Sequence, residues 1–194
     1  MSVELGSGQE IVRVERHTTD PSFIRRVPKS RLAQRKGDAF FDTVHALNPG
    51  EVRLAIADSE AKSTDQNGTR PRLLGAVPVF DDAKGNVFGL VVVETDAVAE
   101  AERILDRHVG GQADIFITDG HGQIWVSSRP GRGVKAETAT VNVATFVPKA
   151  AEFFNSDNTE PTLVIPESGV IANRIRLNSF DPASSVGIIL RLAD

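Results

Sequence analysis

The residue best suited to bind a ligand in this chain is an arginine that shares a strand face with small side chains. In the strand predicted over residues 51–58, successive side chains point to opposite faces, so Arg53 and Ala55 lie together on the inner face. An anion could bind in the space beside this guanidinium, because the planar fork of a guanidinium can hold a carboxylate through two charge-assisted hydrogen bonds. Phe40 or Phe41, on the preceding predicted helix, would form a wall. The sequence thus predicts an anion-binding pocket.

Other charged residues could extend this pocket, which would lie between the inner sheet face and a cover formed by residues 17–50. Arg72, on the next predicted strand, could add a second cation. Asp58 and Asp38 could bind an amine, although a strand end and a helix cap also explain these carboxylates. Arg53 could alternatively pair with a nearby aspartate or lie on an exposed face of the sheet. Both interpretations of Arg53 stay open.

Several other kinds of chemistry have little support in the sequence. The chain has no cysteine, which excludes a disulfide, a thiolate metal site and a thiol nucleophile. Its four histidines lack the spacing of metal ligands. Gly120 and Gly122 lead into a predicted strand, whereas a dinucleotide fingerprint opens a helix. The serine pairs at 127–128 and 184–185 have no nearby base. We therefore expect no enzyme, no catalytic residue, no metal and no cofactor in this segment.

The composition is that of a globular protein with one large or two small domains. Of the 194 residues, 40% are hydrophobic and 25% are charged. The formal net charge of −4 argues against a nucleic-acid binder, because neutralising phosphates requires a basic face. No stretch approaches the roughly 18 to 20 apolar residues that span a bilayer. The first residues resemble the end of a strand, so we expect a piece excised from a longer protein.

The elements that would position the pocket are organised around a hairpin within residues 71–96. Two apolar strands, 73–80 and 87–94, are joined by a turn rich in Asp, Gly and Asn. Three consecutive valines, at 91–93, point to opposite faces of the second strand, so we expect both faces to be covered. Such a hairpin is expected at the centre of a sheet.

Hydrophobic spacing predicts the remaining elements. Further strands are expected at 3–5, 9–16, 51–58, 113–118, 123–128, 162–165, 170–177 and 186–192, and helices at 38–47, at 96–109 and within 143–155. Residues 17–37 are expected to form an irregular crossing with one short helical turn, and 59–70 and 129–141 to form polar connections. The glycine pair at 110–111 indicates a domain boundary. The fold class is therefore α+β, with modules at 1–110 and 111–194, each a small antiparallel sheet flanked by helices.

Four segments in this order resemble the double Cache sensor domains, which are PAS-like extracytoplasmic modules of bacterial sensor kinases, chemoreceptors and cyclases. These segments are GQEIVRVER at 8–16, LAQRKGDAFFDTVHALNPGEVRLAI at 32–56, RPRLLGAVPVFDDAKGNVFGLVVVETD at 70–96 and ADIFITDGHGQIWVSS at 113–128. The resemblance implies a membrane-distal module that binds a small ligand and a membrane-proximal module that passes the change on. It also implies a first module truncated at its N-terminus, a periplasmic location, a homodimeric full-length receptor and membrane anchors outside this chain.

The sequence departs from the family pattern at three positions. Arg53 stands where many relatives have an aromatic residue, Ala55 where we expect a serine, and Leu74 where an arginine often precedes the Pro-Val of the hairpin. An arginine cluster that binds amino acids is therefore doubtful, and Ala55 and Leu74 could instead fill the cavity. Three hypotheses remain: a ligand sensor, a structural or dimerisation module with a degenerate pocket, and a small hydrolase.

Overall fold

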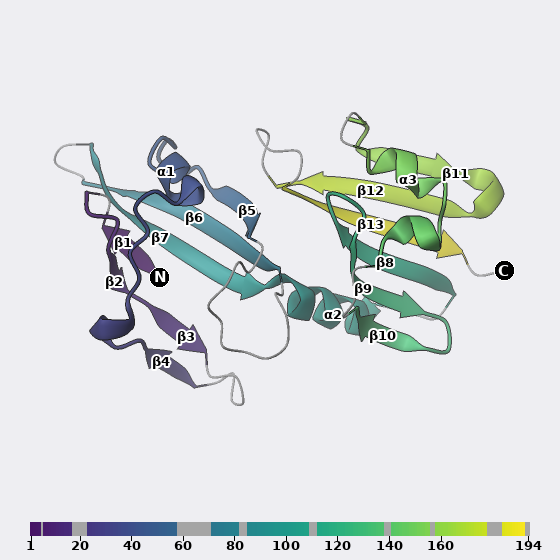
Figure 1. The fold of residues 1–194 in the computed structure, drawn as a ribbon, viewed down its shortest axis with the longest axis horizontal. Coiled ribbons are helices and arrows are strands. Elements are labelled where there is room, and N and C mark those ends of the chain that lie inside the picture. The colour runs from purple at the N-terminus through teal and green to yellow at the C-terminus, as the bar shows by residue number, and fades with distance from the viewer. Residues whose placement is uncertain are drawn as a thin grey trace. The chain divides into compact units, whose positions relative to one another are not determined.

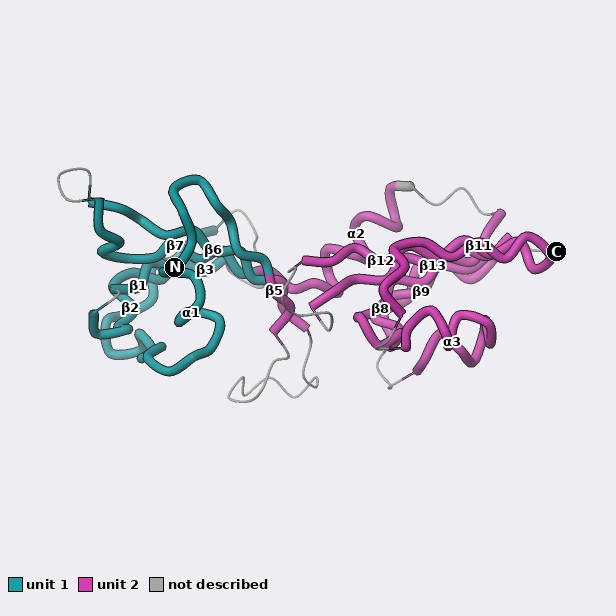
Figure 2. The backbone as a smooth tube through the Cα atoms, turned by 90° about the horizontal axis from the view of Figure 1, so that it is seen from above, with its two compact units in different colours: residues 1–54, 74–94 teal, residues 55–73, 95–194 magenta. Residues whose placement is uncertain are grey.

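The chain folds as an α+β protein built mostly of antiparallel sheets with few helices, as predicted (Figure 1). The computed structural model describes residues 1–4, 6–16, 23–57, 71–81, 85–108, 112–137, 141–155, 158–177 and 184–192. Contacts divide the chain into one compact unit of residues 1–54 and 74–94 and a second of residues 55–73 and 95–194 (Figure 2). The predicted boundary at Gly110 and Gly111 lies outside the described residues, as does the predicted loop 59–70.

The first sheet has five strands in the order β2-β1-β7-β6-β5. They are β1 (Ser2–Glu4), β2 (Glu10–Val12), β5 (Arg53–Ala57), β6 (Arg72–Phe80) and β7 (Val87–Asp96). β6 and β7 form the predicted hairpin, in which the Asp81 N–H donates to the Asn86 carbonyl oxygen at 2.8 Å. Neither strand of the hairpin is at an edge of the sheet, so its predicted interior position is confirmed.

One face of β7 is exposed, which corrects the prediction that both faces of the hairpin are covered. Leu90 and Val92 are buried, at 2% and 1% exposure, whereas Val91 and Val93 are 42% and 67% exposed. The strand therefore alternates between a core face and an open face, as strands with one packed face do. The run of three valines does not mean that the strand is buried on both sides.

The N-terminal strands differ from the predicted hairpin in one respect. β1 pairs antiparallel with β2 as expected, but the predicted strand 9–16 is interrupted at Arg13. Beyond Arg13, β3 (Val14–Arg16) pairs with β4 (Ile24–Arg26) in a separate two-stranded sheet. The segment predicted to be irregular thus contains strand β4, and its short helical turn is η1 (Lys29–Arg31).

A short helix, α1 (Ala39–Val44), follows this crossing as predicted. Asp38 is its N-cap, and the carboxylate accepts a hydrogen bond from the Phe40 N–H at 3.0 Å. Phe41 and Val44 are buried and belong to the core that also contains Leu90. The helix therefore packs its apolar side against the first sheet.

The second sheet has six strands in the order β10-β9-β8-β13-β12-β11. They are β8 (Ala113–Asp119), β9 (Ile124–Arg129), β10 (Gly133–Ala136), β11 (Thr162–Ile165), β12 (Val170–Arg176) and β13 (Ser185–Leu192). The five predicted strands are confirmed, but β10 forms within 129–141, where we expected only a polar connection. β10 is an edge strand with half-buried and exposed residues, so its hydrophobic pattern is weak.

Two sets of helical segments cover parts of this sheet. The helix α2 (Ala97–His108) contacts β9 and β10 through Val98, Ala101 and Leu105, as its predicted apolar side requires. The predicted helix within 143–155 consists of two short pieces, η2 (Val143–Thr145) and α3 (Ala150–Phe153). Pro148 separates the pieces, because proline cannot donate a backbone hydrogen bond inside a helix. These pieces contribute to a second core around Phe116.

Part of the second sheet has an open apolar face. Val164, Ile171, Ile175 and Ile188, on β11, β12 and β13, are between 38% and 56% exposed. Val164 is paired with Ile171, so these aliphatic side chains form neighbouring rows across the three strands. Among the described residues, no helix is long and apolar enough to span a membrane.

Candidate functional site

The candidate site is built on a close approach between the β1–β2 turn and the segment before α1. Gly8 has a φ of +69°, and a Cβ atom added there would lie 2.6 Å from the Lys36 backbone nitrogen. The Arg35 N–H donates to the Gly8 carbonyl oxygen at 2.8 Å, and the Glu10 N–H donates to the Ala33 carbonyl oxygen at 3.0 Å. A glycine is needed here, and the contact places Arg35 and Lys36 beside the first sheet.

A buried carboxylate holds this arrangement together. Glu10 is only 1% exposed. Its carboxylate accepts hydrogen bonds from the Arg35 Nε at 3.0 Å and the Ala33 N–H at 3.0 Å, and it forms an ion pair with the Arg13 Nη1 at 3.2 Å. Because a buried charge must be paired and hydrogen-bonded, Glu10 determines where Arg35 can lie.

A pocket of about 250 Å³ lies beside Arg35, between the sheet and its cover. Apolar side chains from three elements form its inner wall, namely Val3 of β1, Leu90 of β7 and Phe41 of α1. Gly8 and polar side chains complete the lining, the latter from Glu4, Arg35, Lys36, Asp42 and His45. An apolar wall with a few convergent polar groups is the usual composition of a small-molecule site.

Cationic donors are available at this pocket. The Arg35 Nε and Nη2 hold Glu10, while the Arg35 Nη1 has no partner among the described residues. The guanidinium also lies 5.5 Å from the centroid of the Phe41 ring, which restricts its orientation. The exposed Lys36 side chain adds a second cation. These donors could hold the carboxylate of a small ligand, and Asp42 on the same lining could face an ammonium group.

The residues predicted to form the ligand site are divided by the structure. Phe41 lines the pocket. The Phe40 ring contacts the Phe41 ring edge to face, with ring centroids 5.5 Å apart. The other described candidates are half-buried on neighbouring strands, Arg53 and Ala55 on β5 and Arg72 and Leu74 on β6, and they are not part of this lining. Asp58 lies outside the described residues. A ligand-binding role for each of these residues stays a prediction.

Sequence reasoning overlooked the two cations that do line the pocket. Arg35 and Lys36 stand immediately before Gly37, which has a φ of +83°, and before the helix cap Asp38. A basic pair next to a turn glycine and a helix cap is a weak signal in sequence. Its importance depends on Glu10 and Gly8, which are more than twenty residues away along the chain.

The similarity of this chain to known proteins is found in its fold and not in its sequence. No family model matches the sequence, and no curated protein matches it. A domain of a sensory box/GGDEF family protein from Vibrio parahaemolyticus superposes with a TM-score of 0.65 at 16% identity, over 100% of this chain and 70% of that one. The extracellular domain of a protein assigned as a histidine kinase, vpHK1S-Z8, superposes with a TM-score of 0.63 at 16% identity, over 98% of this chain and 66% of that one.

The chain has the fold of extracellular sensor domains. An extracellular ligand binding receptor from Desulfohalobium retbaense also shares this fold, with a TM-score of 0.54 at 15% identity, over 99% of this chain and 29% of that one. The PAS-like α+β fold expected from the resemblance to double Cache domains is therefore confirmed. The chain spans 66% of the length of the histidine kinase domain and 70% of the GGDEF family domain, so these solved domains contain further elements.

Proposed function

We propose that the chain is the extracytoplasmic sensing domain of a bacterial transmembrane signalling protein, most simply a sensor histidine kinase. The observation that carries this proposal is the pocket between the first sheet and its cover, in a chain with an extracellular sensor-domain fold. The ligand is a small molecule with a carboxylate, and the chain performs no chemistry. The full-length receptor is a homodimer, anchored in the membrane by segments outside this chain, with this domain on the periplasmic side.

Signalling in this proposal is a shift of population between two arrangements. The membrane-distal module, residues 1–110, binds the ligand, and the membrane-proximal module, residues 111–194, passes the change on through its last strand. A ligand shifts such an equilibrium only by its difference in affinity for the two arrangements. Arg35 is suited to create this difference, because Glu10 and Phe41 already fix two sides of its guanidinium.

A second candidate function is a structural or dimerisation module with a degenerate pocket, in which Ala55 and Leu74 fill the interior. The open apolar face formed by Val164, Ile171, Ile175 and Ile188 favours it, because such surfaces often mark contacts with other proteins. The two candidates differ in whether any small molecule stabilises the domain.

A thermal-shift screen against carboxylates, amino acids, amines, purines and sugars tests the first candidate. A ligand at roughly a hundred times its Kd stabilises the native state by about 2.7 kcal/mol, which raises the Tm measurably. We expect a carboxylate to raise the Tm of the native protein and this shift to disappear in Lys36→Gln. Lys29→Gln is the matched control, because Lys29 is exposed on η1 and does not line the pocket.

The variant that loses the ligand-induced Tm shift identifies the residue that anchors the ligand. A shift that survives Lys36→Gln but disappears in Arg53→Ala would place the ligand on β5, as the sequence alone predicts. If no compound raises the Tm of the native protein, the sensing proposal is wrong and the structural module is favoured.

A further inference from the structure

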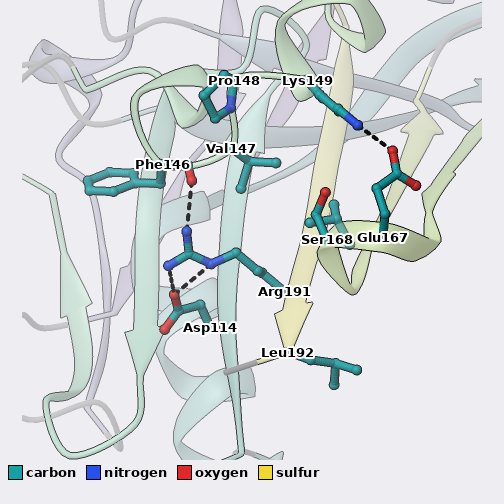
Figure 3. A pocket seen from close by; sticks show the side chains of 10 residues that line it. Asp114, Phe146, Val147, Pro148, Lys149, Glu167, Ser168, Arg191 and Leu192 are labelled. Atoms are coloured by element: carbon teal, nitrogen blue, oxygen red, sulfur yellow. Dashed lines mark hydrogen bonds and ion pairs between the residues drawn. The ribbon is translucent and has the colours of Figure 1, made fainter. Parts of the chain in front are cut away.

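A second and larger pocket lies within the second compact unit. Its volume is about 680 Å³, which is within the range of small-molecule sites. Ten residues line it, namely Asp114, Phe146, Val147, Pro148, Lys149, Glu167, Ser168, Val170, Arg191 and Leu192 (Figure 3). They come from β8, from the connection between η2 and α3, from η3 (Pro166–Ser168), from β12 and from β13. The pocket is therefore separate from the one between the first sheet and its cover.

The floor of this pocket is fixed by Arg191. Its Nε donates to the Asp114 carboxylate at 3.1 Å, its Nη2 donates to the same oxygen, and its Nη1 donates to the Phe146 carbonyl oxygen at 2.7 Å (Figure 3). These bonds connect β13, β8 and the connection that carries Lys149. Each terminal nitrogen of Arg191 thus already donates a hydrogen bond within the protein. This guanidinium therefore shapes the floor and is less available to a ligand than Lys149.

The wall opposite Lys149 is held by a glycine turn. Gly169 has a φ of +58°, and a Cβ atom added there would lie 3.1 Å from the Leu192 Cβ. The Leu192 N–H also donates to the Gly169 carbonyl oxygen at 3.0 Å. Because this turn is attached to the end of β13, the backbone that carries Glu167 has little freedom to move.

Lys149 and Glu167 form an ion pair across the rim (Figure 3). Their side chains are 59% and 62% exposed. Among the described residues, the carboxylate of Glu167 is the partner of Lys149. An ion pair in solvent is held weakly, because water screens both charges and both long side chains lose freedom. Another carboxylate could therefore replace that of Glu167 at the Lys149 ammonium at little cost in free energy.

The charges of the pocket define the class of ligand. Lys149 and Arg191 are balanced by Asp114 and Glu167. When the Glu167 carboxylate moves into solvent, Arg191 stays paired with Asp114, and Lys149 is left as the single positive charge to be matched. A monoanion satisfies it, whereas a dianion such as a phosphate would bring a second, unmatched negative charge into the pocket. Leu192, which is 58% exposed, provides an apolar surface in the same lining for a short tail.

We propose that this pocket binds a small aliphatic monocarboxylate, whose carboxylate replaces that of Glu167 on Lys149 and whose tail lies against Leu192. The pocket touches β13, the strand that transmits the signal in the function proposed above, so it would serve as a second input. No residue is shared between the two linings, so each lining can be changed by substitution without altering the other. The two proposals can therefore fail separately.

The titration of Glu167 offers a first test of the exchange. The hydrogen bond from Lys149 holds the pKa of Glu167 below its ordinary value. Its contribution to stability is therefore present above the carboxyl's ordinary pKa and is lost as the pH falls through the lowered pKa. Asp114 and Arg191, the other charged groups of this lining, are paired with each other. We expect Lys149→Gln to raise the pKa of Glu167 toward its ordinary value, measured by carboxyl carbon NMR.

Glu51 is the matched control for this titration. The N–H of Asn48 donates to its carboxylate at 2.8 Å and holds its pKa below the ordinary value. Glu51 does not line the pocket, so Lys149→Gln should leave its titration unchanged. An unchanged Glu167 titration in Lys149→Gln would contradict the ion pair on which the exchange depends.

The binding test uses sodium butyrate, with butyramide as its uncharged analogue and inorganic phosphate as a dianion. We expect the native protein to bind butyrate in preference to both. Loss of one charge-assisted contact in Lys149→Gln should weaken butyrate binding by about tenfold. Glu167→Gln should strengthen it by about threefold, the change expected when an exposed ion pair worth less than about 1 kcal/mol no longer competes for Lys149. Isothermal titration calorimetry measures these ratios, and Trp125 fluorescence confirms that each variant is folded.

Lys29→Gln, which lines neither pocket, is the control and should leave the affinity for butyrate unchanged. Three outcomes would overturn the proposal: no butyrate binding by the native protein in the millimolar range, equal affinities in the native protein, Lys149→Gln and Glu167→Gln, or loss of binding in Lys36→Gln alone. The last outcome would assign butyrate to the first pocket and would support the sensing function while removing the second site.

Discussion

Replacing Glu10 by alanine is expected to destabilise the first compact unit by about 3 kcal/mol. Removing one partner of a buried ion pair costs roughly 3 to 5 kcal/mol, because the remaining charge is left without compensation. Arg13 and Arg35 keep side-chain exposures of 22% and 27%, so water can solvate them in part. We therefore expect the lower end of that range. The Ala33 N–H would also lose its acceptor.

Urea unfolding followed by the amide NMR signals of residues 2–4 and 89–91 measures this loss, because these residues pair β1 with β7. Glu15→Ala is the matched control. Glu15 also pairs with Arg13, but its side chain is 32% exposed, and an exposed ion pair contributes about 0 to 1 kcal/mol. A destabilisation by Glu10→Ala as small as that of Glu15→Ala would show that Glu10 does not organise the site. In the proposed sensing function, Glu10→Ala should also weaken ligand binding, since Arg35 loses its anchor.

Replacing Phe153 by alanine is expected to destabilise the second compact unit by about 3 to 5 kcal/mol, the usual cost of removing a large buried aromatic ring. Phe153 is 1% exposed and packs edge to face on Phe154 with ring centroids 5.1 Å apart. The guanidinium of Arg174 lies 4.8 Å from the Phe153 ring centroid, and its Nη2 donates to the Phe153 carbonyl oxygen. The ring thus supports both the apolar core and a cation.

Arg174 increases the cost of the change. It is 8% exposed, and burial, assisted by the nearby charge of Arg176, lowers the pKa of its guanidinium. Arginine stays protonated at neutral pH. Its charge is accommodated by the carbonyl oxygens of Phe153 and Asn158 and by the aromatic faces. Without the Phe153 ring, a buried cation would face an empty space.

The fluorescence of Trp125 during urea unfolding measures this loss of stability. Trp125 is the only tryptophan and lies on β9 of the second unit. Val164→Ala is the control, since Val164 is 56% exposed on the same sheet and a surface substitution changes stability by about 0.5 kcal/mol or less. Equal midpoints for Phe153→Ala and Val164→Ala in urea would contradict the role of Phe153 in the core.

Elements that depend on neighbours along the chain could be predicted from the sequence. The hairpin of β6 and β7, the Asp38 cap of α1 and the apolar side of α2 with Val98 each follow from turn residues, local periodicity or capping. The resemblance of four ordered segments added the fold class, which the solved sensor domains confirm. Of the predicted site residues, Phe41 lines the pocket beside the first sheet, whereas the predicted anchor Arg53 does not, and its binding role stays a prediction.

The sequence by itself thus determined the order of most strands and helices, the α+β class and the absence of thiol chemistry. Only the tertiary structure decided which charges converge, because Arg35, Glu10 and Gly8 meet through contacts between distant segments. The same holds for Lys149 and Glu167, which are 18 residues apart and belong to different elements. It also decided which faces stay open: the periodicity of β7 is local, whereas the exposure of Val93 depends on what the rest of the chain leaves uncovered.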